Sequence, residues 1–96
     1  MTVQMCVLLW ARAGAQEALA AYEDKVLALL PDHGGRVVQR ARVTGAGGGQ
    51  PTEIQLLEVE SQAGIDSFMV DERRTALAAE RDAAIERTEI YPVELS

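Results

Sequence analysis

The sequence has few cysteines, few basic residues and few aromatic residues. Cys6 is the only cysteine among 96 residues, which excludes an internal disulfide and a thiolate metal cluster and is typical of a reducing compartment. Nine basic residues against fifteen acidic ones give a net charge of −6. This balance argues against nucleic acid or an anionic membrane as a partner, because both attract clustered positive charge. The chain has one tryptophan, two tyrosines and one phenylalanine, too few for a sheet that stacks RNA bases.

Long hydrophobic runs are also missing. No stretch approaches the roughly 18 apolar residues of a transmembrane helix, and the first residues lack the basic start and the cleavage site of a secretory signal. We therefore expect a soluble, cytoplasmic protein with no membrane partner. A chain of this length predicts a single domain over residues 1–96. Its core is thin, because fifteen of the hydrophobic residues are alanine.

Four segments have the pattern of β-strands. Residues Val3–Arg12 are apolar on both faces of an extended chain, which is typical of a central strand. Arg36–Val43 and Glu53–Glu60 are joined by a glycine-rich hairpin loop, Thr44–Pro51. Thr88–Leu95 forms the last predicted strand, and its internal proline requires an edge position or a bulge.

Two regions have the pattern of helices. Ala15–Leu30 places apolar residues at helical spacing, and Pro31–Gly35 ends it. Glu17, Glu23, Asp24 and Lys25 are expected on its solvent face. Ser61–Arg87 is predicted to be helical in two pieces, whose N-caps are Ser61 and Asp71.

This order predicts an α+β, ferredoxin-like βαββαβ fold: a four-stranded antiparallel sheet with two helices on one face. Symmetric pairing about the loop places Arg42 opposite Glu53, Arg40 opposite Gln55 and Val38 opposite Leu57. The second face of the sheet has nothing in one chain to cover it. An apolar face of this size indicates an interaction surface, and we expect a homodimer. The residues expected there, or else their opposite-face neighbours, are Cys6, Leu8, Trp10, Val38, Leu57 and Val59.

A family resemblance supports this interpretation. The matching residues are Tyr22, Leu30–Arg36 (LPDHGGR), Glu60 and Ser61, Phe68, and Leu77–Arg81 (LAAER). They resemble the small uncharacterised DUF 1330 type branch of the dimeric α/β-barrel superfamily. The resemblance implies two ferredoxin-like protomers whose sheets face each other in one homodimeric α/β barrel. Distant relatives include antibiotic-biosynthesis monooxygenases, EthD-type proteins and haem-degrading enzymes. The chain has no asparagine, which argues against the haem-degrading constellation, and no cofactor is expected.

His33 and Arg81 are the candidate catalytic residues. His33 is the only histidine, and it would act as a general base or hydrogen-bond partner of a substrate; the alternative is a C-terminal helix cap. Arg81 lies between Leu77 and Ile85 on the predicted inward stripe of the second helical region. It would bind a ligand carboxylate or pair with a structural acid.

Four further residues are candidates for ligand binding. Trp10 and Tyr22 could contact a planar ligand, or they could pack at an interface and in the core. Arg40 and Arg42 share a sheet face with Glu53 and Gln55, which predicts either a polar pocket inside the barrel or a solvated charge ladder. One histidine and one cysteine are too few for a zinc or iron site, so no metal site is predicted.

Two functions follow from these observations. The first is a homodimer that binds a small apolar, aromatic or acidic ligand in its barrel. For such a protein the resemblance implies cofactor-free oxidation, isomerisation or cyclisation. The second is a non-catalytic structural or accessory homodimer whose barrel is filled by side chains.

Overall fold

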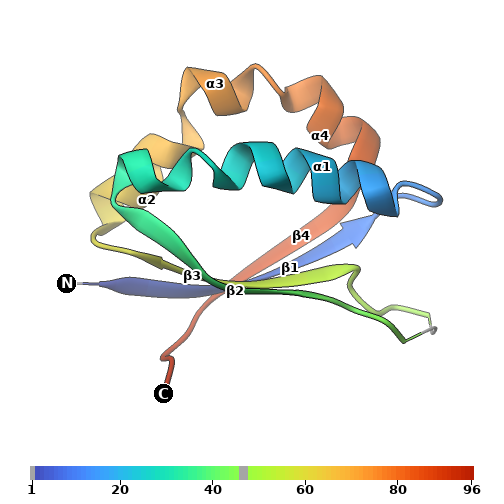
Figure 1. Cartoon of the computed structure of the whole chain (residues 1–96), viewed down its shortest axis with the longest axis horizontal. Coiled ribbons are helices and arrows are strands. Elements are labelled where there is room, and N and C mark those ends of the chain that lie inside the picture. The colour runs from blue at the N-terminus through green and yellow to red at the C-terminus, as the bar shows by residue number, and fades with distance from the viewer. Residues whose placement is uncertain (1, 46–47) are drawn as a thin grey trace.

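The computed structural model describes residues 2–45 and 48–96, which form four strands and a layer of helices (Figure 1). The helix layer includes a short 3-10 helix, η1, between α1 and β2. The elements are β1 (Val3–Ala11), α1 (Gln16–Leu27), η1 (Leu30–His33), β2 (Gly35–Arg42), β3 (Glu53–Val59), α2 (Gln62–Met69), α3 (Glu72–Thr75), α4 (Ala78–Ala84) and β4 (Ile85–Pro92).

The strands form one sheet in the order β2-β3-β1-β4, and every neighbouring pair is antiparallel. All helices lie on the same side of this sheet, while the C-terminal segment extends from the other side (Figure 1). This arrangement confirms the α+β ferredoxin-like fold. The strand that is apolar on both faces, β1, is central, and the proline-containing strand, β4, is at an edge.

The core lies between α1 and one face of the sheet. Val7 and Leu9 of β1 are buried there, and Leu57 and Val59 of β3 lie beside them. The alternation of side chains along a strand places every second residue on this covered face. The residues that α1 and the following turn contribute to the same core are Leu19, Tyr22, Val26, Leu27 and Leu30.

The other face of the sheet is uncovered. It carries Cys6, Leu8 and Trp10 of β1 as predicted, and their neighbours on β3 are Leu56 and Ile54. The placement of Leu57 and Val59 on this face is wrong, because both are buried under α1. β1 is apolar on both of its faces, so its sequence does not indicate which face lies on the same side of the sheet as Leu57 and Val59.

The β2–β3 register follows the prediction over half its length. Arg42 pairs with Glu53 and Arg40 pairs with Gln55. The predicted partner of Leu57 is wrong, because Val37 and not Val38 faces it. The register shifts between Val37 and Gln39, since an extra residue in one strand displaces all following pairs. Residues 46 and 47 of the predicted hairpin loop lie outside the described residues.

The helices are shorter than predicted, although both predicted N-caps are confirmed. The Ser61 hydroxyl accepts a hydrogen bond from the Gly64 amide, and the Asp71 carboxylate accepts one from the Arg73 amide. The second helical region has three pieces and ends at Ala84, so β4 begins before the predicted Thr88. Within residues 2–45 and 48–96, none of the helices has the length and apolar character needed to span a bilayer.

A close approach at Gly64 joins α2 to η1 and can be tested by substitution. A Cβ atom at this position would lie 2.3 Å from the backbone oxygen of His33. Gly64→Ala should therefore lower the free energy of unfolding by about 1–3 kcal/mol, as overpacking does. The control is Gly48→Ala, where a Cβ meets no atom within 4 Å. Equal urea midpoints for both variants would show that the contact is unimportant.

Candidate functional site

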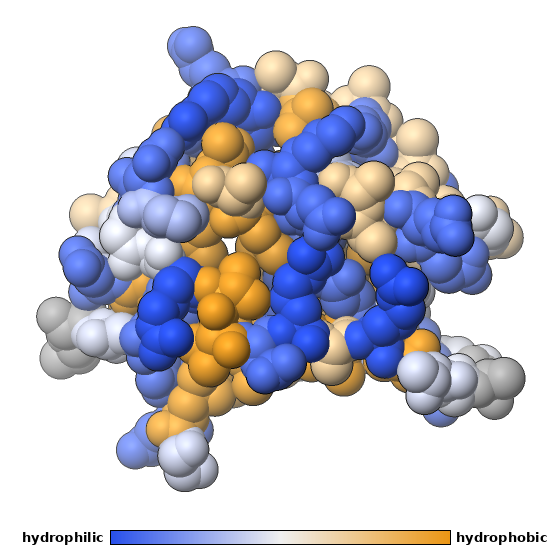
Figure 2. Space-filling model, in the orientation of Figure 1, coloured by the Kyte–Doolittle hydropathy of each residue, from blue (hydrophilic) through white to orange (hydrophobic). Residues whose placement is uncertain are grey.

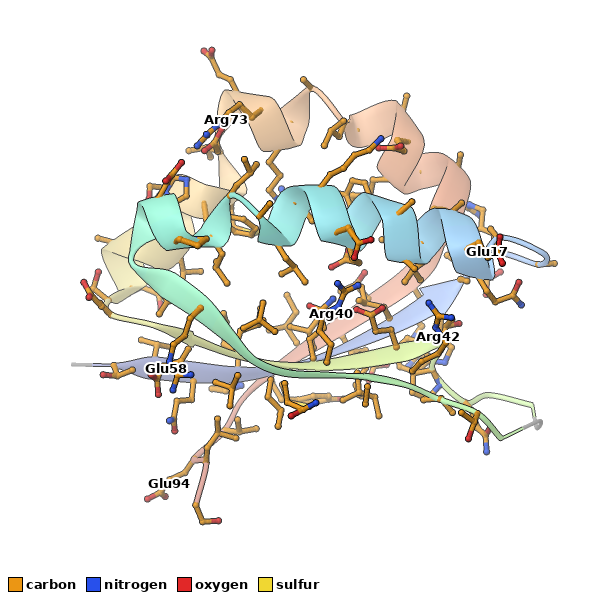
Figure 3. All side chains as sticks on the ribbon, in the orientation of Figure 1. Glu17, Arg40, Arg42, Glu58, Arg73 and Glu94 are labelled. Atoms are coloured by element: carbon orange, nitrogen blue, oxygen red, sulfur yellow. The ribbon has the colours of Figure 1, made fainter. Side chains whose placement is uncertain are left out.

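An open cleft of about 460 Å³ lies between α1 and the strands β2 and β3. Arg40 and Arg42 point from the sheet toward α1 at this place (Figure 3). The space-filling view shows hydrophilic residues over the same region, beside hydrophobic residues (Figure 2). The residues that line the cleft are Ala20, Asp24, Arg40, Ala41, Arg42 and Glu53.

Arg40 is held in place by two carboxylates. Its Nε and Nη2 atoms donate to the two oxygens of Glu53 at 2.9 and 3.1 Å, and its Nη1 donates to Asp24 Oδ1 at 2.6 Å. The hydrogen bonds with Glu53 raise the pKa of Arg40 above its ordinary value. The guanidinium therefore stays charged and forms a fixed wall of the cleft.

Behind this wall, a single amide joins two buried carboxyl groups. Gln55 is 1% exposed, and its Nε2 atom donates to Glu23 Oε1 and to Glu53 Oε2, both at 2.7 Å. Glu23 and Glu53 are each 5% exposed. Both hydrogens of the amide are used in this way, so one neutral donor group serves two acids.

Glu23 has a weaker set of partners than Glu53, which also pairs with Arg40. Burial raises the pKa of Glu23, the hydrogen bond from Gln55 opposes this effect, and the nearby Glu53 adds to the increase. A carboxyl group with a raised pKa exchanges protons closer to neutral pH. Glu23 does not line the cleft itself, so its raised pKa is a property of the buried cluster behind the Arg40 wall.

Arg42 is the cleft cation that remains available. It lines the cleft and is exposed. Among the residues that the structure describes, it has no carboxylate partner within 4 Å, whereas Arg40 has two. A guanidinium in this state can bind a carboxylate or phosphate with paired hydrogen bonds.

Local periodicity brings these residues together. Ala20, Glu23 and Asp24 are spaced by three and four along α1, so they share one face of the helix. Residues 40 and 42 of β2 and residues 53 and 55 of β3 lie on one face of the sheet, because each pair is separated by two. The shared face of the four sheet residues was predicted correctly, but its direction was wrong. Arg40 and Arg42 face α1 and not the interior of a sheet-to-sheet barrel.

Glu23 and Asp24 were expected on the solvent face of the first helix. Glu23 is in fact buried. Its position offered a signal, since it lies four residues after Leu19 and three before Val26, both of which are core residues. An acid in the apolar stripe of an amphipathic helix is such a signal, because buried acids need specific partners.

His33 lies outside the cleft, in η1, and contacts the α2–α3 region. Its Nδ1 atom is 2.7 Å from Ser67 Oγ, and its Nε2 atom is 2.7 Å from Asp71 Oδ2. No local pattern identifies an orienting acid for this histidine, because Asp71 is 38 residues away in the chain. Asp71 is itself bound by Arg73, which also pairs with Asp32.

The predicted inward orientation of Arg81 is wrong. Its side chain is 44% exposed, and its partner is Asp82 at 3.6 Å. The predicted inward stripe through Leu77, Arg81 and Ile85 requires one continuous helix. Ile85 instead begins β4, and α4 starts at Ala78, so the assumed spacing does not apply.

The two aromatic candidates also lie away from the cleft lining. Tyr22 is 2% exposed in the core, and burial raises the pKa of its hydroxyl. Trp10 is on the uncovered face, where its Nε1 donates to the Gly49 carbonyl and the Arg87 guanidinium lies 4.4 Å from its ring centroid. Over the described residues, no group of three or more His, Cys, Asp or Glu is placed to hold a metal ion.

Comparisons with known proteins show the fold. No protein-family model and no curated protein matches the chain. A protein of unknown function from Rhodopseudomonas palustris is 20% identical with a TM-score of 0.79, covering 99% of this chain and 82% of its own. A dimeric ferredoxin-like protein of unknown function from Thermobifida fusca has a TM-score of 0.70 at 11% identity, covering 99% and 92%. A dimeric protein of ferredoxin-like fold from Bacteroides fragilis has 0.68 at 14%, covering 98% and 96%.

The raised pKa of Glu23 predicts a pH-dependent effect on stability. Its folded-state pKa lies above the unfolded value of 4.5, so the stability it contributes is present below that value and is lost as pH rises through the folded pKa. Glu23→Gln retains a carbonyl oxygen for Gln55 but cannot ionise. The variant should therefore gain stability relative to the unaltered protein as pH rises from about 4 to 8.

Urea unfolding at several pH values measures this difference. The matched control is Glu17→Gln, on the same helix at an exposed position. A difference in unfolding free energy for Glu23→Gln that stays constant with pH would contradict the assignment.

Proposed function

We propose that this protein is a homodimer that binds a small anionic molecule in the α1–β2 cleft of each protomer. The proposal of ligand binding is based on the cleft, which has Arg42 available at its wall and the buried Glu23–Gln55–Glu53 cluster behind it. The proposal of a homodimer is based on the uncovered apolar face of the sheet. We infer an acidic ligand because the available cleft cation is a guanidinium.

The dimer is supported by the composition of the uncovered face. Cys6, Leu8 and Trp10 lie there beside Leu56 and Ile54, and contiguous apolar surfaces of this kind are uncommon on soluble monomers. Two solved structures that share the fold are described as dimeric. Packing one such face against its copy buries the apolar side chains of both protomers at once, as in a two-fold symmetric interface.

Replacing Leu8 by glutamate tests the dimer. Leu8→Glu places a charge from each protomer in the proposed interface, where an uncompensated charge costs about 3 kcal/mol or more. We expect the dissociation constant to rise by more than about 100-fold, so the variant is a monomer in native mass spectrometry and light scattering.

The control for this experiment is Val70→Glu. Val70 is 72% exposed and directly follows α2, which lies on the side of the sheet that carries the helices (Figure 1). The control should remain dimeric. A Leu8→Glu protein that stays dimeric, or an unaltered protein that is monomeric at tens of micromolar, would overturn the proposed interface.

Ligand binding is tested through Arg42. Charge-assisted hydrogen bonds contribute about 1.5–3 kcal/mol, so Arg42→Gln should weaken binding of a small carboxylate by roughly 10- to 100-fold. Calorimetry with benzoate, salicylate and 2-oxoglutarate as probes measures this loss. Arg36→Gln is the control, because Arg36 lies on the same strand but pairs with Glu58 outside the cleft.

Two results would contradict ligand binding in the cleft. One is equal affinity of a probe for the Arg42→Gln and Arg36→Gln proteins. The other is no binding of any of the probes to the unaltered dimer, which would favour the accessory homodimer with a filled interior.

The resemblance to the dimeric α/β-barrel superfamily implies cofactor-free oxidation, isomerisation or cyclisation for such a protein. Glu23 lies behind the cleft and is not among the residues that line it, so the proposal for the cleft is ligand binding and names none of these reactions.

A further inference from the structure

A second group of reactive side chains lies outside the cleft. Ser67 of α2, His33 of η1 and Asp71 at the start of α3 form a chain of two contacts through the imidazole ring. Ser67 Oγ is 2.7 Å from His33 Nδ1, and His33 Nε2 is 2.7 Å from Asp71 Oδ2. A hydroxyl, an imidazole and a carboxylate in this order are the parts of an activated serine nucleophile.

The proton positions in the Ser67–His33–Asp71 group follow from the ionisation of the Asp71 carboxylate. Arg73 donates to both oxygens of its carboxylate, from Nε at 3.1 Å and from Nη2 at 2.8 Å. The hydrogen bonds from Arg73 and then from His33 hold the pKa of Asp71 well below its usual range. Because an ionised carboxylate only accepts hydrogen bonds, Nε2 of His33 carries the hydrogen. In the neutral ring Nδ1 is then an acceptor that faces the Ser67 hydroxyl.

The burial of the three groups suits this role. The side chains of His33 and Asp71 are 13% and 9% exposed, whereas Ser67 is exposed. The Ser67 hydroxyl also donates to the Gly64 carbonyl within its own helix at 3.0 Å, which is the longer of its two contacts. Because a hydroxyl has one hydrogen, Ser67 gives up this bond when it donates to His33. The hydroxyl is accessible to a molecule from solvent.

We propose that Ser67 is a nucleophile activated by His33 and that this second site hydrolyses small uncharged esters. In the first step the Ser67 oxygen bonds to the ester carbonyl carbon, and the bond from that carbon to the leaving oxygen breaks. His33 Nδ1 takes the hydroxyl proton and passes it to the leaving alcohol. In the second step water attacks the acyl-serine, His33 takes a proton from that water, and the Ser67 oxygen leaves and recovers a proton.

The surroundings of Ser67 define the class of ester. Phe68 stacks edge-on against His33 at 5.8 Å, and the next residues, Met69 and Val70, are 42% and 72% exposed. Because apolar side chains follow Ser67 in the chain, we choose an apolar acyl group for the proposed ester. Arg74 lies 5.5 Å from the centre of the Phe68 ring and donates to the Met69 carbonyl.

This site is separate from the α1–β2 cleft. None of its three members lines that cleft, and Arg73, which orients Asp71, lies at the opposite end of the molecule from Arg42 (Figure 3). The two proposals can therefore fail independently of each other.

The test uses the full chain with p-nitrophenyl acetate. We expect a burst of p-nitrophenolate followed by slow turnover, and peptide mapping should find one acetyl group on Ser67. Ser67→Ala should abolish the burst, and His33→Gln should slow acylation on the order of 100-fold, which is the usual contribution of a general base. Asp71→Asn keeps an N-cap side chain for α3, so a loss of acylation in this variant reports the positioning role of the carboxylate and not loss of the helix.

The control variant is Thr75→Ala, which removes another helical hydroxyl, one that contacts the Glu72 carbonyl. It should leave the burst unchanged. The chain has a single lysine, Lys25, so nonspecific acetylation of side-chain amines is easily separated from serine acylation. Should a variant fail to fold by circular dichroism, labelling of the unaltered protein with a fluorophosphonate decides the question. Labelling at Ser67 supports the proposal. It is overturned by an absent burst, by acetyl groups on Lys25 and the N-terminus alone, or by equal bursts with and without Ser67.

Discussion

The two faces of the central strand β1 set the constraint on which the rest of the structure depends. Val7 and Leu9 point to the helices and are buried, while Cys6 and Leu8 point the other way. One layer of helices can cover only one face, so the apolar side chains on the other face are left uncovered within one chain. At roughly 25 cal/mol per Å² of apolar surface, the uncovered face is a substantial reserve of stability that a second copy can supply. A two-faced strand in a two-layer fold is therefore the basis of the proposed homodimer.

A polar cluster occupies part of the covered face, where the same reasoning would place apolar residues. Glu53 and Gln55 continue the buried positions of Leu57 and Val59 along β3. Buried charges seldom increase stability over well-packed apolar residues, and here one amide must satisfy two carboxyl groups while a single guanidinium balances Glu53. A chain with so many alanines has little stability to lose. The cluster lies next to the open cleft, and Glu53 belongs to both.

The sequence predicts the order of elements well, because hydrophobic periodicity and turn residues are local signals. It predicts the site less well, for reasons visible in particular residues. An irregularity between Val37 and Gln39 shifts the register of β2 against β3, and no local sequence pattern predicts this shift. The charge of Glu23 predicts a position on the solvent face, but its place in the apolar stripe of α1 puts it in the core. The partners of His33 are 34 and 38 residues away in the chain, so only the packing of α2 and α3 against η1 brings them together.

The direction that Arg40 and Arg42 face changes how the dimer and the cleft are related. If these side chains lay inside a barrel between two sheets, each ligand site would need residues or walls from both protomers. They lie instead between β2 and α1 (Figure 3), on the opposite side of the sheet from the proposed interface. Each protomer of the proposed homodimer then carries a complete cleft, and the interface would act on that cleft only through the stability of the sheet. A monomeric variant that still folds would therefore retain ligand binding in proportion to its folded fraction, whereas a barrel site would be lost with the interface.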